Sequence, residues 1–248
     1  MEKLLRDLFE LPPGARVLDI GCGKGDLARR LRSAGYEAHG ADFAASLPDP
    51  CPDYLRPIEA TTLRDSRRSY TVTSTYRLPF EDGAFRAVVS TSVLEHVIDK
   101  EAFFREVRRV LVPGGILLGM FPGSKSLPVE THVKVPLMNF FWPRVPRLWL
   151  AFWAIIGVRN EFQHGKPWRT VYRSNLDYCR NSLSYWPVRK YRQFLNRSGF
   201  HDFQCGTVDF LQHMDGGYAA LLRRLRVPRP LRRALCDVRN VTISAIRD

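Results

Sequence analysis

Two acidic residues enclose a short glycine-rich segment near the N-terminus, and their spacing is the clearest chemical signal in the sequence. Asp19 lies two residues before a run of alternate glycines that begins with Gly21 and Gly23, and Asp26 follows the last of them. Alternate glycines let the backbone turn sharply and let a ligand come close. Carboxylates at both ends would repel a pyrophosphate, whereas they suit a ligand that carries an ammonium and a sulfonium group. We therefore expect a small-molecule site at this turn.

A strand and a helix are needed to hold this turn in place. Residues 17–20 are mostly apolar, as in a parallel strand that is covered on both faces. Apolar residues then recur at helical spacing over 27–34, and Gly35 is a typical helix stop. A second run, 36–42, ends in Asp42, where a carboxylate can accept hydrogen bonds from ribose hydroxyls. This pattern predicts a strand, a glycine turn, a helix and a second strand around a nucleoside.

Four segments, in this order, resemble the class I S-adenosylmethionine-dependent methyltransferases, and specifically the type 11-like group that methylates metabolites, quinones, lipids and sugars. They are VLDIGCGKG at 17–25, GAD at 40–42, LPFEDGAFRAVVSTSVLEHV at 78–97 and LVPGGILL at 111–118. The resemblance implies S-adenosylmethionine as methyl donor and S-adenosylhomocysteine as product. The cofactor contacts that it implies are Asp19, Gly21, Cys22, Gly23, Asp42, Phe43, Ser74, Thr75, Thr91 and Leu94.

The sequence departs from the pattern of this family at two places. Arg86 stands where the family usually has Asp after the Phe, and Ser74 and Thr75 stand where it usually has an acid near the adenine. These departures affect the expected adenine contacts more than the glycine turn.

The alternation of strands and helices predicts an α/β fold with a Rossmann-like, doubly wound, mostly parallel seven-stranded sheet. We expect the third strand at 69–74, the fourth at 85–91 and the fifth at 116–121, with a helix at 100–111 before the fifth. A further strand at 200–206 and an antiparallel closing strand at 240–247 complete the predicted sheet.

We expect a single methyltransferase domain over residues 1–248. Within it, 1–121 form the cofactor-binding half, 122–185 a substrate-facing helical insertion or lid after the fifth strand, and 186–248 a closing helix and strands with an arginine-rich segment. The formal net charge is +13, and residues 1–121 contain equal numbers of basic and acidic residues. The whole basic excess therefore falls on 122–248, which favours an anionic partner.

The insertion contains an uncharged apolar segment, 148–158, with aromatic residues and arginines on its flanks. It is shorter than the roughly 20 residues that a membrane-spanning helix needs. An interfacial helix on an anionic membrane surface fits this composition. A lid over the pocket and a dimer contact are the two structural alternatives.

A hydroxyl acceptor needs a base, and imidazole has a suitable pKa near neutrality. We predict His132 as this base, with Glu130 orienting it, because both follow closely after the fifth strand. For Glu95 and His96, which are adjacent in the sequence, the family resemblance implies a mainly structural role. The histidines never occur at i, i+3 or i, i+4 spacing, and no cysteine pair accompanies them, so we expect no metal site.

These observations predict O-methylation of an anionic or lipid-linked acceptor, such as a surface-glycan sugar or an isoprenoid quinone. The alternatives are a soluble methyltransferase of small metabolites and a non-catalytic adenosylmethionine-binding module. Nucleic acid is disfavoured, because TSVLEH at 91–96 lacks the Asn/Asp-Pro-Pro-aromatic element typical of base-amino methylation. Scattered cysteines and no evident signal peptide suggest a cytoplasmic protein, with a peripheral position on the inner face of a membrane as the further expectation.

Overall fold

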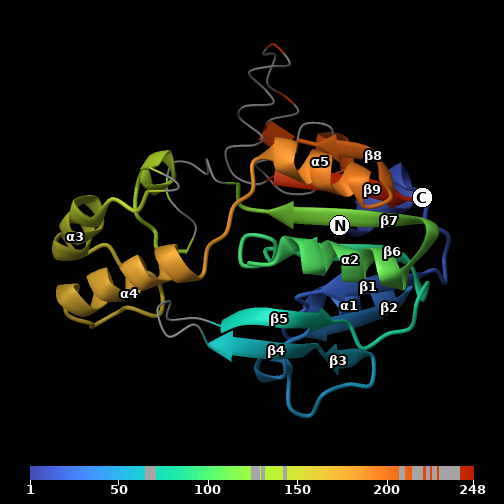
Figure 1. Ribbon diagram of the computed structural model, residues 1–248, viewed down its shortest axis with the longest axis horizontal. Helices are drawn as coiled ribbons and strands as arrows, with labels where there is room; N and C mark the ends of the chain where they lie inside the picture. The colour runs from blue at the N-terminus through green and yellow to red at the C-terminus, as the bar shows by residue number, and fades with distance from the viewer. Residues whose placement is uncertain are drawn as a thin grey trace.

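The computed structural model describes residues 1–64, 71–123, 129, 132–141, 144–206, 210–213, 220–221, 224, 228 and 241–248. Within them, a seven-stranded sheet forms the centre of the molecule, as Figure 1 shows. In spatial order its strands are β3 (Leu55–Pro57), β2 (Glu37–Asp42), β1 (Arg16–Ile20), β6 (Phe85–Thr91), β7 (Leu111–Phe121), β9 (Val241–Arg247) and β8 (Phe200–Cys205).

The strand directions confirm the predicted doubly wound sheet with one antiparallel closing strand. The pairs from β3 through β7 are all parallel. The strand β9 runs antiparallel to both of its neighbours, β7 and β8. Ile20 of β1 is in register with Ala41 of β2 and Ser90 of β6, so these three strands end at the same edge. The segments that follow them are therefore brought together.

The predicted third strand was placed in the wrong sheet. Strand β5 (Thr71–Arg77) covers most of the β-branched segment that suggested it, but it pairs antiparallel with β4 (Glu59–Arg64) in a separate two-stranded sheet. The position beside β2 is taken instead by the short strand β3, which lies within a proline-rich stretch. Residues 65–70, where the predicted strand begins, lie outside the described part of the chain.

Helices cover both faces of the sheet, because successive residues of the central strands point to opposite sides. One face packs against α2 (Lys100–Val110) and α5 (Val188–Arg197) through an aromatic cluster that includes Phe104 and Tyr191. The other face contacts an N-terminal helical turn, Leu4–Leu8, and α1 (Asp26–Ser33). These two apolar layers hold the sheet between helices, and the edges of the sheet are left for a functional site.

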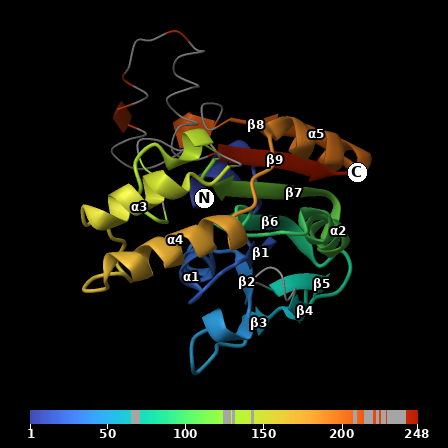
Figure 2. The ribbon, with the colours of Figure 1, turned by 60° about the vertical axis from the view of Figure 1, so that its left-hand side comes forward.

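The insertion forms a separate pair of helices, α3 (Arg147–Ile155) and α4 (Trp168–Asn181). They pack against each other through a small core of their own that includes Leu150 and Cys179. Figures 1 and 2 show this pair at one end of the molecule, on the side toward which the arrow of β7 points. Within the described residues, no helix has the length and apolar character required to cross a membrane.

Candidate functional site

The glycine turn is joined to the end of β2 by side-chain and backbone hydrogen bonds. The Gly23 amide donates to Oδ2 of Asp42 at 2.7 Å, and the Phe43 amide donates to Oδ1 of the same carboxylate at 2.7 Å. The Gly21 amide donates to the Ala41 carbonyl at 2.7 Å. The carboxylate that the sequence assigned to the ribose hydroxyls is thus held in one orientation beside the turn.

Gly21 is needed for both its backbone conformation and its small size. Its φ is +77°, a left-handed conformation that L-residues with side chains rarely adopt. A Cβ atom at this position would overlap Cγ2 of Val93, which follows β6. The turn and the segment after β6 therefore approach each other closely at this point.

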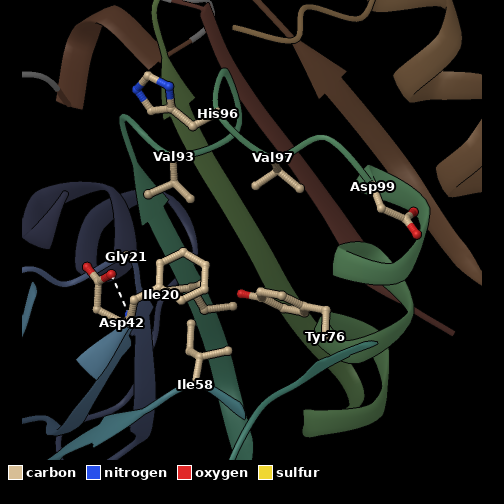
Figure 3. Close-up of a pocket in the computed structure, with 10 residues that line it drawn as sticks. Ile20, Gly21, Asp42, Ile58, Tyr76, Val93, His96, Val97 and Asp99 are labelled. Atoms are coloured by element: carbon tan, nitrogen blue, oxygen red, sulfur yellow. Dashed lines mark hydrogen bonds between the residues drawn. The ribbon is translucent and has the colours of Figure 1, made fainter. Parts of the chain in front are cut away.

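A cavity opens beside this contact, at the carboxyl edge of the sheet where ligands of open α/β sheets bind. Its empty space measures about 490 Å³, including the part that is open to solvent. In Figure 3, Val93 and Val97 lie above Ile20, and His96 is at the end opposite Ile58. The lining residues are Ile20, Gly21, Asp42, Phe43, Ile58, Tyr76, Val93, His96, Val97 and Asp99.

Asp19 is buried next to the turn, and its environment penalises its negative charge. Its side chain is 1% exposed, and Oδ1 has no hydrogen-bond partner among the described residues. Burial, and then the nearby charge of Asp42, raise the pKa of Asp19 to about 7. A buried carboxylate oxygen without a donor fits a ligand group that brings a positive charge or an N–H to it. This arrangement agrees with the ammonium-bearing ligand that the sequence suggested.

The predicted cofactor residues do not all face the cavity. Gly21, Asp42 and Phe43 line it. The Cys22 side chain instead packs in a small apolar cluster with Leu55, and burial raises the pKa of its thiol to about 12.

The remaining predicted contacts come from β5 and from the end of β6. Leu94 is buried in the main core, and Thr91 lies at the carboxyl end of β6. The side chains of Ser74 and Thr75 lie outside what the structure describes. Tyr76, one residue further along β5, does line the cavity, and burial raises the pKa of its phenol.

The predicted base lies in a cluster that the sequence did not suggest. Glu130 lies outside the described residues, so its pairing with His132 stays a prediction. Instead, Nε2 of His132 is 4.0 Å from Oε1 of the buried Glu95, and Nε2 of His96 is 3.9 Å from the same oxygen. Neither residue of this Glu95–His96 pair was expected to take part in chemistry. No local spacing signals the cluster, because His132 is far from the pair in sequence.

We predict that the buried carboxyl of Asp19 makes the ligand-free protein less stable as the pH rises from about 4 to about 7. A group whose folded-state pKa is raised contributes most below its unfolded pKa, and that contribution falls as the pH approaches the folded pKa. The loss is about 1.4 kcal/mol for each unit of pKa shift. Urea unfolding at several pH values should show this decline in the free energy of unfolding.

Asp19→Asn should remove the decline, whereas the exposed Asp26→Asn should retain it. An equal pH dependence in Asp19→Asn and in the wild-type protein would contradict the assignment of this effect to Asp19.

Comparisons with known proteins agree with this geometry. Residues 18–119 match a family model described as a methyltransferase domain. The chain is 35% identical over 148 residues to 2-methyl-6-phytyl-1,4-hydroquinone methyltransferase of Synechocystis, covering 59% of this chain and 42% of that protein. It is 30% identical over 136 residues to phosphoethanolamine N-methyltransferase 2 of Caenorhabditis elegans, covering 53% and 30%. The chain thus spans less than half the length of either relative.

A solved structure has the same fold over nearly the full length of both chains. It is an S-adenosylmethionine-dependent methyltransferase from Mesorhizobium loti, with a TM-score of 0.52 and 20% identity over 99% of this chain and 98% of that one. The matched family segment includes the glycine turn, Asp42 and the residues after β6 that line the cavity. These matches support a class I S-adenosylmethionine-dependent methyltransferase.

Proposed function

We propose that the protein transfers a methyl group from S-adenosylmethionine to a hydroxyl of an anionic or lipid-linked acceptor, at or near a membrane surface. A surface-glycan sugar and an isoprenoid quinone are acceptors of this type. The observation that carries the proposal is the α3–α4 insertion, which presents an apolar stripe beside basic residues at the same end of the molecule as the carboxyl end of β7.

The cofactor part of the proposal assigns a separate task to each acid. Asp42 accepts hydrogen bonds from the ribose hydroxyls, and Asp19 faces the ammonium group across the glycine turn. Gly21 and Gly23 give the ligand access to the backbone. The sulfonium of S-adenosylmethionine supplies an activated methyl group: the O–C bond to the acceptor forms as the S–C bond breaks, leaving a thioether. Cys22, Phe43, Ser74, Thr75, Thr91 and Leu94 remain proposed contacts through the segments on which they lie.

The acceptor hydroxyl must lose its proton as the new bond forms. We propose His132 as the base that accepts this proton when no other group activates the hydroxyl. Nε2 of His132 is 4.0 Å from Oε1 of Glu95, so we propose that Glu95 helps to orient the ring, while the pairing of His132 with Glu130 stays a prediction. Holding the acceptor in line with the sulfonium is the larger contribution, since positioning alone can supply about 7 to 11 kcal/mol.

The membrane part of the proposal rests on the outer face of α3. Leu148, Phe152 and Ile155 follow one another at helical spacing and are 88%, 48% and 59% exposed. The opposite face of α3 packs on α4, so this stripe is not part of the insertion's own core. Arg144 and Arg147 are exposed at the start of the helix. Apolar side chains beside cations are typical of a helix that lies in an anionic membrane interface.

The names of the two relatives support this class of acceptor. One relative is named for a hydroquinone with a phytyl chain, and the other for phosphoethanolamine, which carries a phosphate. One acceptor is therefore lipid-like and the other anionic. A soluble metabolite methyltransferase, with α3 and α4 as a lid, is the alternative that the next experiments separate from the proposal.

We predict that Asp19→Ala and Gly23→Val each weaken S-adenosylmethionine binding at least ~10-fold, measured by isothermal titration calorimetry. The first removes the carboxylate that faces the ammonium group, and about 1.4 kcal/mol corresponds to that factor. The second places a β-branched side chain at a φ of +51°. Asp202→Ala, an exposed change on β8, is the control. Unchanged affinity in both variants would remove this assignment.

We predict that the protein floats with liposomes containing anionic lipid and that Leu148→Ser combined with Phe152→Ser abolishes flotation. Burying such a side chain contributes about 1.5 to 3 kcal/mol, so losing two should weaken binding more than ~10-fold. Val188→Ser, an exposed apolar position on α5, is the matched control and should float normally. If the wild-type protein stays with the soluble fraction, the soluble alternative holds instead.

We also predict where the methyl group goes. Incubation of the protein with a cell extract and S-adenosylmethionine carrying a labelled methyl group should place the label in the organic-solvent extract or in anionic glycans. Label that appears only in neutral, water-soluble metabolites would favour the soluble alternative. The Gly23→Val protein is the control for background labelling.

A further inference from the structure

Three side chains from two segments of the chain converge at one end of the cavity. One donor atom from each of Glu95, His96 and His132 lies within 4.8 Å of the other two. Glu95 is fully buried, and the two imidazoles are partly exposed, at 36% for His96 and 21% for His132. The cluster is thus buried on the side of the Glu95 carboxylate and partly exposed to solvent on the side of the two imidazoles.

The hydrogen bonding of His96 determines which ring nitrogen carries the hydrogen and which carries the lone pair. Its Nδ1 lies 2.7 Å from the carbonyl oxygen of Ser182, the residue that follows α4. Since a carbonyl can only accept, Nδ1 carries the hydrogen, and Nε2 of the neutral ring has the lone pair. That Nε2 is the atom 3.9 Å from Glu95 Oε1. Metal-binding histidines are commonly fixed in this way, with the second nitrogen donating to a backbone carbonyl.

The surrounding structure holds the cluster in place. The Ser184 amide donates to the backbone carbonyl of Glu95 at 2.7 Å, which fixes the segment that carries two of the three side chains. The ring of Tyr178 on α4 lies 5.4 Å from that of His132 and 6.1 Å from that of His96, measured between ring centroids. An aromatic wall of this kind limits access of solvent to the donor atoms.

The distances from Glu95 to the two imidazoles are close to those between ligands of one ion, and all three donor atoms lie within 4.8 Å of one another. Zinc binds imidazole nitrogen and carboxylate oxygen at about 2.0 to 2.2 Å, which separates two tetrahedral ligands by roughly 3.4 Å. The two measured separations from Glu95 Oε1, 3.9 and 4.0 Å, need to shorten by only about half an ångström to meet that geometry. Two imidazoles and one carboxylate are also a known ligand set for catalytic zinc and for other divalent transition metals.

We propose that Glu95, His96 and His132 bind one divalent transition-metal ion of the zinc type, with an open coordination position toward the cavity. His96 lines the same cavity as Gly21 and Asp42, so the open position faces the space beside the cofactor site. Metal binding itself is independent of methyl transfer. The further role, which rests on the proposed function, is to coordinate the acceptor hydroxyl and lower its pKa, so that its proton passes to solvent while His132 acts as a ligand.

The test uses the chain of residues 1–248 without an affinity tag, stripped of metal with a chelator and titrated with cobalt(II) chloride. We expect saturable binding of one ion, with the visible absorption of coordinated cobalt. His132→Gln should lower the cobalt affinity at least ~10-fold, because even partners of metal ligands contribute 10- to 100-fold. His164→Gln, an exposed histidine of the same insertion, is the matched control and should bind cobalt like the wild-type protein.

Glu95→Gln changes a fully buried residue, so His132→Gln, at the more accessible side of the cluster, is the decisive variant. Calorimetric titration of the same samples with S-adenosylmethionine separates the two proposals. Cofactor binding without saturable cobalt binding, or equal cobalt affinity in His132→Gln and the wild-type protein, overturns the metal site alone. If cobalt binding depends on His132 but the protein does not bind S-adenosylmethionine, the metal site is supported and the proposed function is overturned.

Discussion

The carboxylate of Asp42 accepts a hydrogen bond from each of the amides of Gly23 and Phe43, and the rest of the site depends on this interaction. It ties the turn after β1 to the end of β2, so the two segments cannot move apart independently. A ligand that bonds to Asp42 therefore meets an oriented group. The charged form of Asp19 is destabilised by this arrangement. Burial, and then the negative charge of the nearby Asp42, raise the pKa of Asp19. A positively charged ligand would relieve the repulsion between the two carboxyls.

Much of the sheet could be predicted from sequence because its strands carry local signals. The strands β1, β6 and β7 contain apolar runs, β2 ends at the acid that was expected beside the ribose, and β9 alternates between apolar and polar residues. The error at the third strand has a physical cause. The segment around β5 has strong β propensity, but propensity does not specify a partner, and β5 pairs with β4. The short strand β3 lies among prolines and has almost no signal of its own.

The residues of the candidate site also differ in whether a local sequence signal could identify them. Gly21 and Asp42 could be found because their roles follow from a turn and a strand end that are local in sequence. The cluster of Glu95, His96 and His132 could not, since its members meet only after the insertion folds back on the segment following β6. Spacing rules for metal ligands describe ligands on one helix or one loop, and they do not detect donors that tertiary structure assembles. The structural role first given to Glu95 and His96 came from the family resemblance, which says nothing of a histidine in this chain's own insertion.

The insertion connects the two surfaces that a lipid-linked acceptor would need. Helix α4 packs against the inner face of α3, and its last turn bears Tyr178. Ser182, which follows the helix, accepts a hydrogen bond from His96 through its carbonyl. One helix of fourteen residues, about 21 Å long, thus contacts both the helix that exposes the apolar stripe and the histidine cluster at the cavity. An acceptor whose chain stays in a membrane under α3 has to reach the cavity over a distance of this order. This arrangement favours acceptors with a reactive head that extends from the membrane surface over those whose reactive group lies deep in the bilayer.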